Sequence, residues 1–470
     1  MVKQFDTGSK AVYSLLIVFY LFYALFIIVR QGADMGYKGA NDIVNVALVG
    51  CGGMGMGVIN NLKPFEDVRV VAVADPIGRY QDDFFYKRPV GREVAAEEYT
   101  KFYGERFPGH VCKAYEDFRV MLDEMDKDID AVVCATPDHL HAYVSVYCMR
   151  RGKHVYCEKP LGHNIREVRW MAKVAKEMNV ATQMGNLGHA REGMRQAIEI
   201  IRDGGIGTVT EAHAWVPAAR WHKWMTAVPT DTPPAPADMN WDLWLGPRPV
   251  RPYHHVYAPV RWRDFWTFGL GAIGDFVCHD MDLICWALDL VAPTTVEAFQ
   301  AGKTSPELTP HAEICHYFYK GAYNKPDLHV TWWDGGLRPP TPACWPEGRP
   351  WPSRGSMFVG TKATMLCPDL GGRPELFPKS YDDNYTRPEP SIPRSVGHHR
   401  EWIDAIKGGK PGGTEFGYAA RLTELALLGV VAIRTGKKIE WDYENMKAIG
   451  VPEADAIING EPYREGWELE

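Results

Sequence analysis

Short apolar runs rich in β-branched residues alternate with longer stretches of mixed polarity between residues 43 and 185. Such runs are typical of strands buried on both faces of a parallel sheet, and the stretches between them are long enough for crossover helices. The stretch 139–151, for example, has the character of a helix. The pattern therefore predicts an α/β fold that begins with a doubly wound sheet, with strands at 43–50, 68–75, 130–137, 154–160 and 180–185.

A glycine-rich turn follows the first of these strands. Gly50, Gly52 and Gly55 have the spacing G-x-G-x-x-G, with Gly53 and Met54 between them. The first glycine allows a tight turn, the second lets a diphosphate approach the backbone, and the third lets the next helix lie against the strand. The N-terminus of that helix can receive the phosphates. The motif predicts a dinucleotide site in which these five residues are candidate ligands.

Asp75 ends the second predicted strand, twenty residues after Gly55. A carboxylate at this place accepts hydrogen bonds from an adenosine ribose and repels a 2'-phosphate, which favours NAD over NADP. The nearby Arg79 keeps NADP open as an alternative. We therefore expect NAD to be the cofactor.

Polar side chains also end two further predicted strands. Thr136, Pro137 and His139 follow one apolar run, and Glu158 and Lys159 follow the next. In a doubly wound sheet, ligands bind outside the carboxyl ends of the strands. We expect these five residues to face the cofactor.

Tryptophan is concentrated in the later part of the chain, where twelve of sixteen fall between Trp215 and Trp351. Aromatic faces beside hydrogen-bond donors suit sugar rings, which have apolar C–H faces and a belt of hydroxyls. A place in the core or an interface is the alternative for any single tryptophan. The pattern predicts a carbohydrate substrate, with candidate contacts from His189, His213, Trp215, His254 and Arg263.

Composition narrows the class of protein. With 470 residues, 46% of them hydrophobic and 24% charged, the chain resembles an average globular protein of two or three domains. The net charge of -7 and the lack of basic runs exclude nucleic acid as an expected partner. The ten cysteines contain no C-x-x-C pair, and the histidine spacings form no recognisable ligand set, so no metal is predicted. Segment 333–394, rich in proline and glycine, is predicted to be a loop that either covers a pocket or elaborates the surface.

The N-terminal residues 11–29 carry no charge and as a helix would span roughly 28 Å, close to the thickness of a bilayer core. No small-x-small cleavage pattern precedes the folded part, so the segment predicts an uncleaved signal anchor. A membrane-anchored or exported protein on the periplasmic face is then expected. A buried helix or a misassigned start codon, with a cytoplasmic enzyme, is the alternative.

Several motifs together resemble a known family. "ALVGCGGMG", "ADP", "ATPDHLHA" and "EKPL" occur in the order found in the glucose-fructose oxidoreductase, inositol dehydrogenase and rhizopine-catabolism (Gfo/Idh/MocA) family. The resemblance continues through "QMGNLGHAREGMR", "GAIGDFVCHDMDLICWAL" and "GHHREWIDAIKGG", and covers nearly everything after residue 40. The later blocks are similar to a branch common in glycan-degrading bacteria, whose members are often exported. Many of those relatives begin like twin-arginine substrates, whereas this chain has no arginine pair at its start.

The resemblance implies a catalytic set. Lys159 matches the lysine of the family's E-K-P motif, which lies near the nicotinamide and the reacting hydroxyl. Asp275 and His279 match its D-x-x-x-H pair, whose histidine is taken as the acid-base. Residues four apart share a helix face, so Asp275 can orient or charge-stabilise His279, while Lys159 can stabilise a developing alkoxide.

The resemblance also implies the architecture. We expect a hydrophobic anchor and linker at 1–40, a Rossmann domain at 41–185, and a tail at 446–470. Between the last two, residues 186–445 are expected to form an α+β domain for substrate binding and oligomerisation, with a large, open, mostly antiparallel sheet. The family commonly pairs through this domain, so a dimer or tetramer is expected.

Three functions remain open from the sequence. The first is an NAD-dependent oxidoreductase that acts on a secondary hydroxyl of a sugar or glycoside, with C3 as one position. The second is an NAD-dependent glycoside hydrolase that oxidises, eliminates and reduces with tightly bound cofactor. The third is a membrane-tethered binding or sensor protein in which NAD is structural, and the intact Lys159, Asp275 and His279 argue against it.

Overall fold

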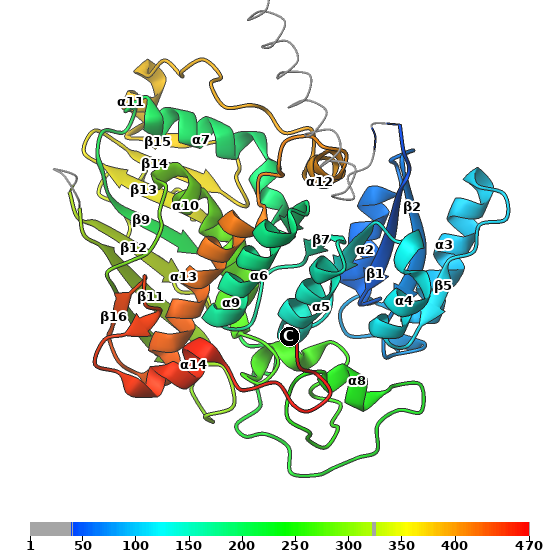
Figure 1. Ribbon diagram of the computed structural model, residues 1–470. Coiled ribbons are helices and arrows are strands. Elements are labelled where there is room, and N and C mark those ends of the chain that lie inside the picture. The colour runs from blue at the N-terminus through cyan, green and yellow to red at the C-terminus, as the bar shows by residue number, and fades with distance from the viewer. Residues whose placement is uncertain (1–38, 40, 322–325, 470) are drawn as a thin grey trace, which may run out of the picture.

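A parallel six-stranded sheet forms the first half of the structure, a computed structural model that describes residues 39, 41–321 and 326–469 (Figure 1). The predicted membrane segment at 11–29 lies outside the described residues. The strand order is β5-β2-β1-β6-β7-β8, and every pairing is parallel. The strands are β1 (Val44–Val49), β2 (Val68–Ala74), β5 (Lys113–Tyr115), β6 (Ala131–Cys134), β7 (His154–Cys157) and β8 (Thr182–Met184).

All five predicted strands are present, which confirms the predicted doubly wound sheet. The order reverses between β1 and β6, so the crevice for a ligand opens at the carboxyl ends of these two strands. The short edge strand β5 and a separate hairpin of β3 (Tyr80–Asp82) and β4 (Arg88–Val90) were not predicted. The helices of this half are α2 (Gly53–Leu62), α3 (Arg92–Arg106), α4 (Phe118–Met125), α5 (Asp138–Arg150) and α6 (Ile165–Met178), with 3-10 turns η1 (Asp126–Asp128) and η2 (Leu187–Ala190).

A nine-stranded sheet forms the second half, in the order β15-β14-β13-β9-β12-β11-β10-β16-β17. Only β12 and β9 pair in parallel, so the prediction of a mostly antiparallel sheet is confirmed. The strands are β9 (Val209–Trp215), β10 (Thr295–Ala301), β11 (Ala312–Tyr319), β12 (Leu328–Trp333), β13 (Gly355–Gly360), β14 (Thr364–Pro368), β15 (Glu375–Phe377), β16 (Ile439–Asp442) and β17 (Lys447–Ala448).

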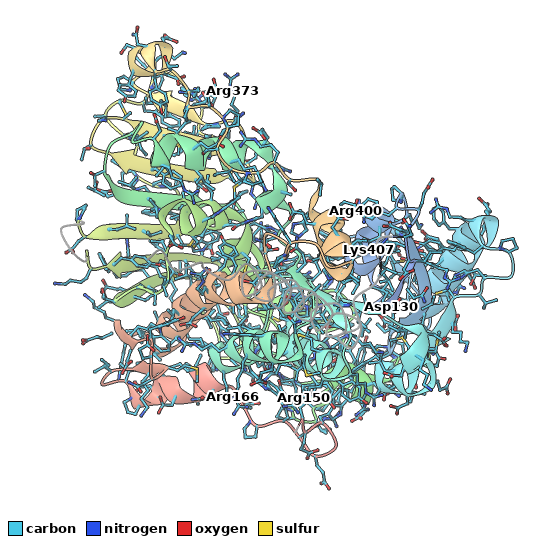
Figure 2. The ribbon with its side chains drawn as sticks, turned by 45° about the horizontal axis from the view of Figure 1, so that its top comes forward. Asp130, Arg150, Arg166, Arg373, Arg400 and Lys407 are labelled. Carbon is cyan, nitrogen blue, oxygen red and sulfur yellow. The ribbon has the colours of Figure 1, made fainter. Side chains whose placement is uncertain are left out.

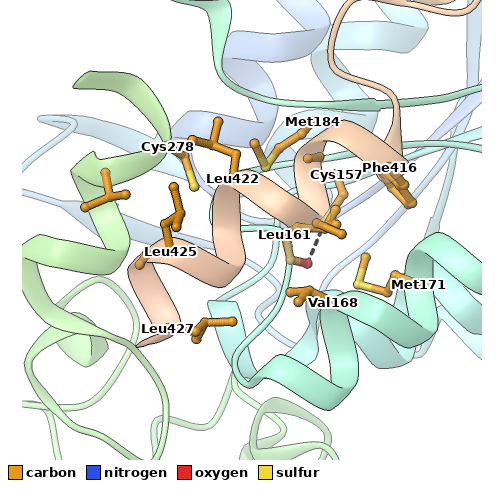
Figure 3. Packing of buried hydrophobic residues seen from close by; sticks show 14 of the residues in the cluster. Cys157, Leu161, Val168, Met171, Met184, Cys278, Phe416, Leu422, Leu425 and Leu427 are labelled. Atoms are coloured by element: carbon orange, nitrogen blue, oxygen red, sulfur yellow. Dashed lines mark hydrogen bonds between the residues drawn. The ribbon is translucent and has the colours of Figure 1, made fainter. Parts of the chain in front are cut away.

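Helices cover one face of this second sheet (Figure 1). They are α7 (Glu192–Arg202), α9 (Gly271–Asp280), α10 (Asp282–Leu288) and α13 (Phe416–Thr435), while α8 (Trp241–Leu245), α11 (Lys379–Asn384), α12 (His398–Ile406), α14 (Asp455–Asn459) and the turns η3 (Arg261–Asp264) and η4 (Pro452–Ala454) lie elsewhere. Within the described residues, α13 is the one helix long and apolar enough to cross a membrane, and most of it is buried in the protein. Figure 3 shows Phe416 and Leu422 of α13 beside Cys157 and Leu161, so the same core joins both sheets.

Segment 333–394 is not the predicted loop throughout. It contributes the three strands β13, β14 and β15 and the helix α11. The short apolar stretches Met357–Val359 and Met365–Cys367 provide the core face of these strands, and the surrounding prolines and glycines hide this signal. The portions before β13 and after α11 are irregular, as are the connections between the three strands.

Helix α12 returns from the C-terminal part of the chain to the first sheet. Its residues Trp402 and Ile406 are fully buried in the core of the first half, where the Trp402 ring packs against Tyr156 of β7. Arg400 and Lys407 donate to the Asp67 carboxylate at 2.8 and 2.6 Å, and Figure 2 shows both beside the strands of the first sheet. These cations outweigh the effect of burial and hold the pKa of Asp67 at about 2. The residues after 186 therefore complete the core of the first half as well.

Candidate active site

A cleft lies at the carboxyl ends of β1, β2, β6 and β7 and encloses about 860 Å³, including open solvent. The predicted residues Gly50, Gly52, Met54, Asp75, Thr136, Pro137, Glu158 and Lys159 all line it. The second half of the chain supplies the opposite wall through Trp244, Trp262 and Arg263. The cleft therefore joins the predicted cofactor crevice to the domain predicted to bind substrate.

The glycine turn has the shape that the motif requires. Gly50 has a φ of 94°, and a Cβ there would lie 2.5 Å from the Ala135 carbonyl oxygen. A Cβ on Gly55 would lie 2.1 Å from the Gly50 carbonyl oxygen, whereas nothing lies within 4 Å of one on Gly52. The first and third glycines thus close the strand-to-helix turn, and the second leaves open space. This space in front of the N-terminus of α2 fits a diphosphate.

Asp75 lies beside that turn. Its Oδ2 accepts from the Cys51 amide at 2.6 Å and its Oδ1 from the Ile77 amide at 2.8 Å. Burial raises the pKa of Asp75 to about 6, although both amides act against the rise. Arg79 points away and pairs with Glu97 at 2.5 Å on the surface. Arg79, which was the reason to consider NADP, thus does not line the cleft. The residues that do line it fit NAD.

Lys159 and Asp275 form the central contact of the site. The Lys159 ammonium donates to Asp275 Oδ1 at 2.5 Å and to the Asp275 carbonyl oxygen at 3.1 Å. Arg263 Nε lies 3.3 Å from the other carboxylate oxygen. Burial alone would lower the pKa of Lys159, but Asp275 reverses this and raises it. Lys159 and Arg263 hold the pKa of Asp275 well below its usual range. Lys159 is therefore a positively charged group at neutral pH.

His279 follows one turn later on α9. Its Nδ1 is buried and has no hydrogen-bond partner among the described residues. Burial lowers the pKa of His279 to about 3, and the Lys159 and Arg354 cations act in the same direction. Among the described residues, the Asp275 carboxylate accepts from Lys159 and lies beside Arg263, and no contact with His279 is found. His279 is thus a neutral imidazole, and its orientation by Asp275 stays a prediction.

Arg354 reaches this helix from the segment before β13. Its guanidinium forms two hydrogen bonds with the Asp280 carboxylate, at 2.9 and 2.5 Å, and the Asp280 side chain is fully buried. Ser356 Oγ also donates to the Asp280 carbonyl oxygen at 2.6 Å. These contacts fix the end of α9 that carries His279.

Two more carboxyl groups face the Lys159 cation. Burial raises the pKa of Asp138 to about 8 and that of Glu158 to about 7. Asp138 begins α5 and lines the cleft, as its place directly after the apolar run at 130–137 predicts. Near neutral pH, these groups are partly protonated and can donate hydrogen bonds.

Several candidate residues lie outside the cleft lining, Asp275 and His279 among them. His139 is fully buried with Nε2 at 3.0 Å from the Trp244 carbonyl oxygen, and His189 Nδ1 lies 3.0 Å from Asp282. His213 and Trp215 lie on the second sheet, where Trp215 Nε1 donates to the Pro352 carbonyl oxygen at 3.0 Å. His254 lines a different surface pocket beside Asp231. Of the predicted substrate contacts, the structure brings only Arg263 to Lys159.

Four tyrosine and tryptophan residues of the cleft were not predicted from the sequence: Tyr80, Tyr86, Trp244 and Trp262. The two tryptophans belonged to a crowded group, and no spacing distinguished them from core tryptophans such as Trp332. The "DDFFY" stretch that contains Tyr86 could have drawn attention, because three consecutive aromatic residues between two short apolar runs are unusual for a surface turn.

One buried group has the composition of a metal site. Ligand-type atoms of Cys134, His141 and Cys157 lie within 4.8 Å of one another. Both ring nitrogens of His141 already contact main-chain oxygens, of Pro160 at 2.7 Å and Thr136 at 2.9 Å. A metal ion would have to displace one of these contacts, so the prediction of no metal is retained as a prediction.

Parts of the chain are similar in sequence to known proteins. The chain is similar to a levoglucosan dehydrogenase from Pseudarthrobacter phenanthrenivorans, at 32% identity over 25% of this chain and 28% of that protein. It is also similar to a 2,7-anhydro-N-acetylneuraminate hydratase from Mediterraneibacter gnavus, at 28% identity over 36% of this chain and 39% of that protein. A glycosyl hydrolase family 109 protein from Shewanella amazonensis matches at 26% identity over 38% of this chain and 36% of that protein. The matches thus span less than two fifths of these relatives' own length.

The fold has solved counterparts and matching family models. The WlbA dehydrogenase from Bordetella pertussis, solved with NADH and UDP-GlcNAcA, superposes with a TM-score of 0.58 at 16% identity, over 85% of this chain and 99% of that one. Residues 44–186 match the family model described as "Oxidoreductase family, NAD-binding Rossmann fold", and residues 209–320 match "Oxidoreductase family, C-terminal alpha/beta domain". Together these matches cover more than half of the chain. The chain belongs to the Gfo/Idh/MocA oxidoreductase family.

Proposed function

We propose that the protein is an NAD-dependent oxidoreductase that oxidises a secondary hydroxyl of a sugar or glycoside, with hydride leaving the carbon that bears this hydroxyl. The contact between Lys159 and Asp275 carries the proposal, because it places a fixed cation where the cofactor cleft meets the second domain. A buried, paired lysine of this kind is poor as a base and good as an electrostatic partner. It suits a reaction in which negative charge develops on an oxygen.

The roles of the residues follow from their charge states. NAD, when bound, supplies the hydride acceptor. The neutral His279 imidazole takes the hydroxyl proton, and the Lys159 ammonium stabilises the oxygen as that proton leaves. Asp275 keeps Lys159 protonated and in place. Asp75 and the glycine turn hold the ribose and diphosphate.

The chemistry of the cleft wall supports a sugar substrate. Trp244 and Trp262 offer aromatic surface, and the Arg263 guanidinium lies over the Trp262 ring, 4.3 Å from its centroid. Apolar faces next to fixed donors match the C–H faces and hydroxyls of a pyranose. The identity of the sugar and the carbon that is oxidised, with C3 as one candidate, belong to this proposal.

A second candidate is net hydrolysis of a glycoside through transient oxidation, elimination, addition of water and reduction. The similarity to a glycosyl hydrolase family 109 protein and to a hydratase favours it, because both names describe redox-neutral reactions. If residues 11–29 anchor the protein outside the cytoplasm, as we also propose, no free NAD pool is at hand. The cofactor would then have to be restored within each cycle.

The test follows the redox state of the nicotinamide in the full-length protein. Copurified cofactor is released and identified from one sample, and the absorbance of bound nicotinamide is followed in another while glycosides are added without external NAD. Stoichiometric keto-sugar and NADH on addition of NAD support the dehydrogenase. Release of aglycone with no net NADH supports the hydrolase.

The variant His279→Ala separates both enzymes from a non-catalytic NAD protein. On a confirmed substrate we expect turnover to fall at least about a hundredfold while NADH binding stays intact. Unchanged turnover would refute the role of His279. A wild-type protein that binds NADH but converts no sugar in the panel would favour the sensor.

A further inference from the structure

The β3–β4 hairpin brings a side chain into the cofactor cleft that the fingerprint does not account for. The buried carboxylate of Asp82 accepts hydrogen bonds from the amides of Phe84, Phe85 and Tyr86, at 3.0, 3.2 and 2.6 Å. One side chain thus fixes the whole tip of the hairpin. As a result, Tyr86 lines the cleft together with Lys159.

The ring of Tyr86 lies directly on Gly53. A Cβ added to Gly53 would lie 2.0 to 2.4 Å from three atoms of the ring. Gly53 is not one of the three spaced glycines, and its φ is not in the left-handed region. The position would therefore accept other residues if the ring were elsewhere. The three atoms nearest to such a Cβ all belong to Tyr86, so contact with this ring accounts for a glycine here.

The other end of Tyr86 faces the charged cluster. Burial raises the pKa of the Tyr86 hydroxyl, and among the charges that act on it Arg263 opposes the rise most strongly. Next to it, the Phe85 ring contacts Trp221 with centroids 5.1 Å apart, and the Arg261 guanidinium lies 4.0 Å from the Phe84 ring centroid. The hairpin therefore bridges from the glycine turn to the second domain, across the cleft.

We propose that Tyr86 is a cofactor-contacting residue that forms the outer wall of the NAD site and slows release of the cofactor. Its ring packs over the diphosphate and the adjoining ribose, between the Gly53 turn and Lys159. The inference rests on the proposed function only in placing NAD in this cleft, and it does not depend on the sugar. Slow release is what the redox-neutral candidate needs, because its cofactor is restored within each cycle.

The first experiment compares Tyr86→Ala with Tyr86→Phe in the full-length protein, using NADH fluorescence without any sugar. Loss of the ring is expected to raise both the dissociation rate and the Kd for NADH by about tenfold. The phenylalanine variant keeps the ring and is expected to stay within about threefold of wild type. An alanine variant that folds and releases NADH at the wild-type rate would overturn the proposal.

The second experiment tests the contact from its other side. Gly53→Ala is expected to displace the ring and weaken NADH binding by about tenfold, whereas Gly57→Ala in the same helix meets nothing within 4 Å and serves as the control. In the Tyr86→Ala background, Gly53→Ala should have little further effect. If Gly53→Ala weakens binding equally in both backgrounds, Gly53 acts without Tyr86 and the proposal fails. Because no substrate is used, these outcomes are independent of whether the protein oxidises a sugar.

Discussion

The Lys159 ammonium lies 2.5 Å from the Asp275 carboxylate, and the two residues come from different halves of the chain. Lys159 follows the end of β7 in the first sheet, and Asp275 lies on α9 beside the second sheet. The charge state of the site therefore depends on how the two halves are docked. A single side-chain contact sets both the catalytic cation and part of the domain interface.

Replacement of Asp275 by asparagine should change the pH profile as well as the rate. Without the carboxylate, burial lowers the pKa of Lys159, so the alkaline limb of the kcat profile should move to lower pH. We expect kcat to fall on the order of 10²-fold, and the free energy of unfolding to fall by about 3 kcal/mol because two buried cations lose their partner.

Asp242→Asn is the matched control for this measurement, because Asp242 pairs with Arg464 while 63% of its own side chain is exposed. It should leave the rate, the pH profile and the urea denaturation midpoint close to wild type. An unmoved alkaline limb in Asp275→Asn would contradict the assignment of that limb to Lys159.

Removal of the Arg354 cation should raise the pKa of His279, since Arg354 lowers it. A histidine base acts only when it is unprotonated, so in Arg354→Met the acid limb of kcat/KM should move to higher pH. Arg373→Met removes an exposed arginine from the same part of the chain and should not move it. Identical acid limbs in both variants would exclude His279 as the group that titrates there.

His139 should make the protein less stable in acid. Its pKa is lowered by burial to about 3, against about 6.5 in the unfolded chain. Between these values the unfolded state binds more protons, so stability is fully present above pH 6.5 and falls as the pH falls, by about 1.4 kcal/mol per unit for one group.

The variant His139→Asn removes this titrating group. The free energy of unfolding, measured by urea denaturation, should then depend less steeply on pH between pH 6.5 and 4.5. Its difference from wild type at pH 7.5 measures the packing cost alone. Equal slopes for the two proteins would show that other groups dominate acid denaturation.

Trp262 should contribute to sugar binding and not to NAD binding. We expect Trp262→Ala to raise KM for the sugar about tenfold or more and to leave the Kd for NADH within about twofold. Trp345 packs on the far face of the second sheet with Trp351, so Trp345→Ala should lower stability without changing KM. A sugar KM that responds equally to both variants would argue against a direct contact.

Local patterns in the sequence predicted the first sheet and its cofactor residues. Strands buried on both faces leave continuous apolar runs, and the glycines of a phosphate turn are set by backbone geometry alone, so both signals are local. Gly50, Gly55 and Asp75 took the expected places for this reason. The edge strand β5 was missed because three residues at the margin of a sheet carry little apolar signal.

The wall of the cleft could not be predicted in the same way. Trp262 lines the same cleft as Lys159 only because the two halves of the chain dock, and neither the period nor the spacing of residues in the sequence indicates such an arrangement. His213 and Trp215 had suitable chemistry, but their strand carries them to another sheet face. The position of Tyr86 in the cleft depends on a hairpin that Asp82 shapes. In the glycine motif, only the additional Gly53 indicates it.

The return of α12 to the first sheet has a consequence for synthesis of the chain. The last strand of that sheet ends at Met184, but Trp402 and Ile406 complete its core. During synthesis, more than two hundred further residues must therefore be added after β8 before α12 can cover its part of the core of the first sheet. Until then, nascent chains would expose the apolar residues that α12 later covers, and chaperones that recognise such surfaces would bind to them.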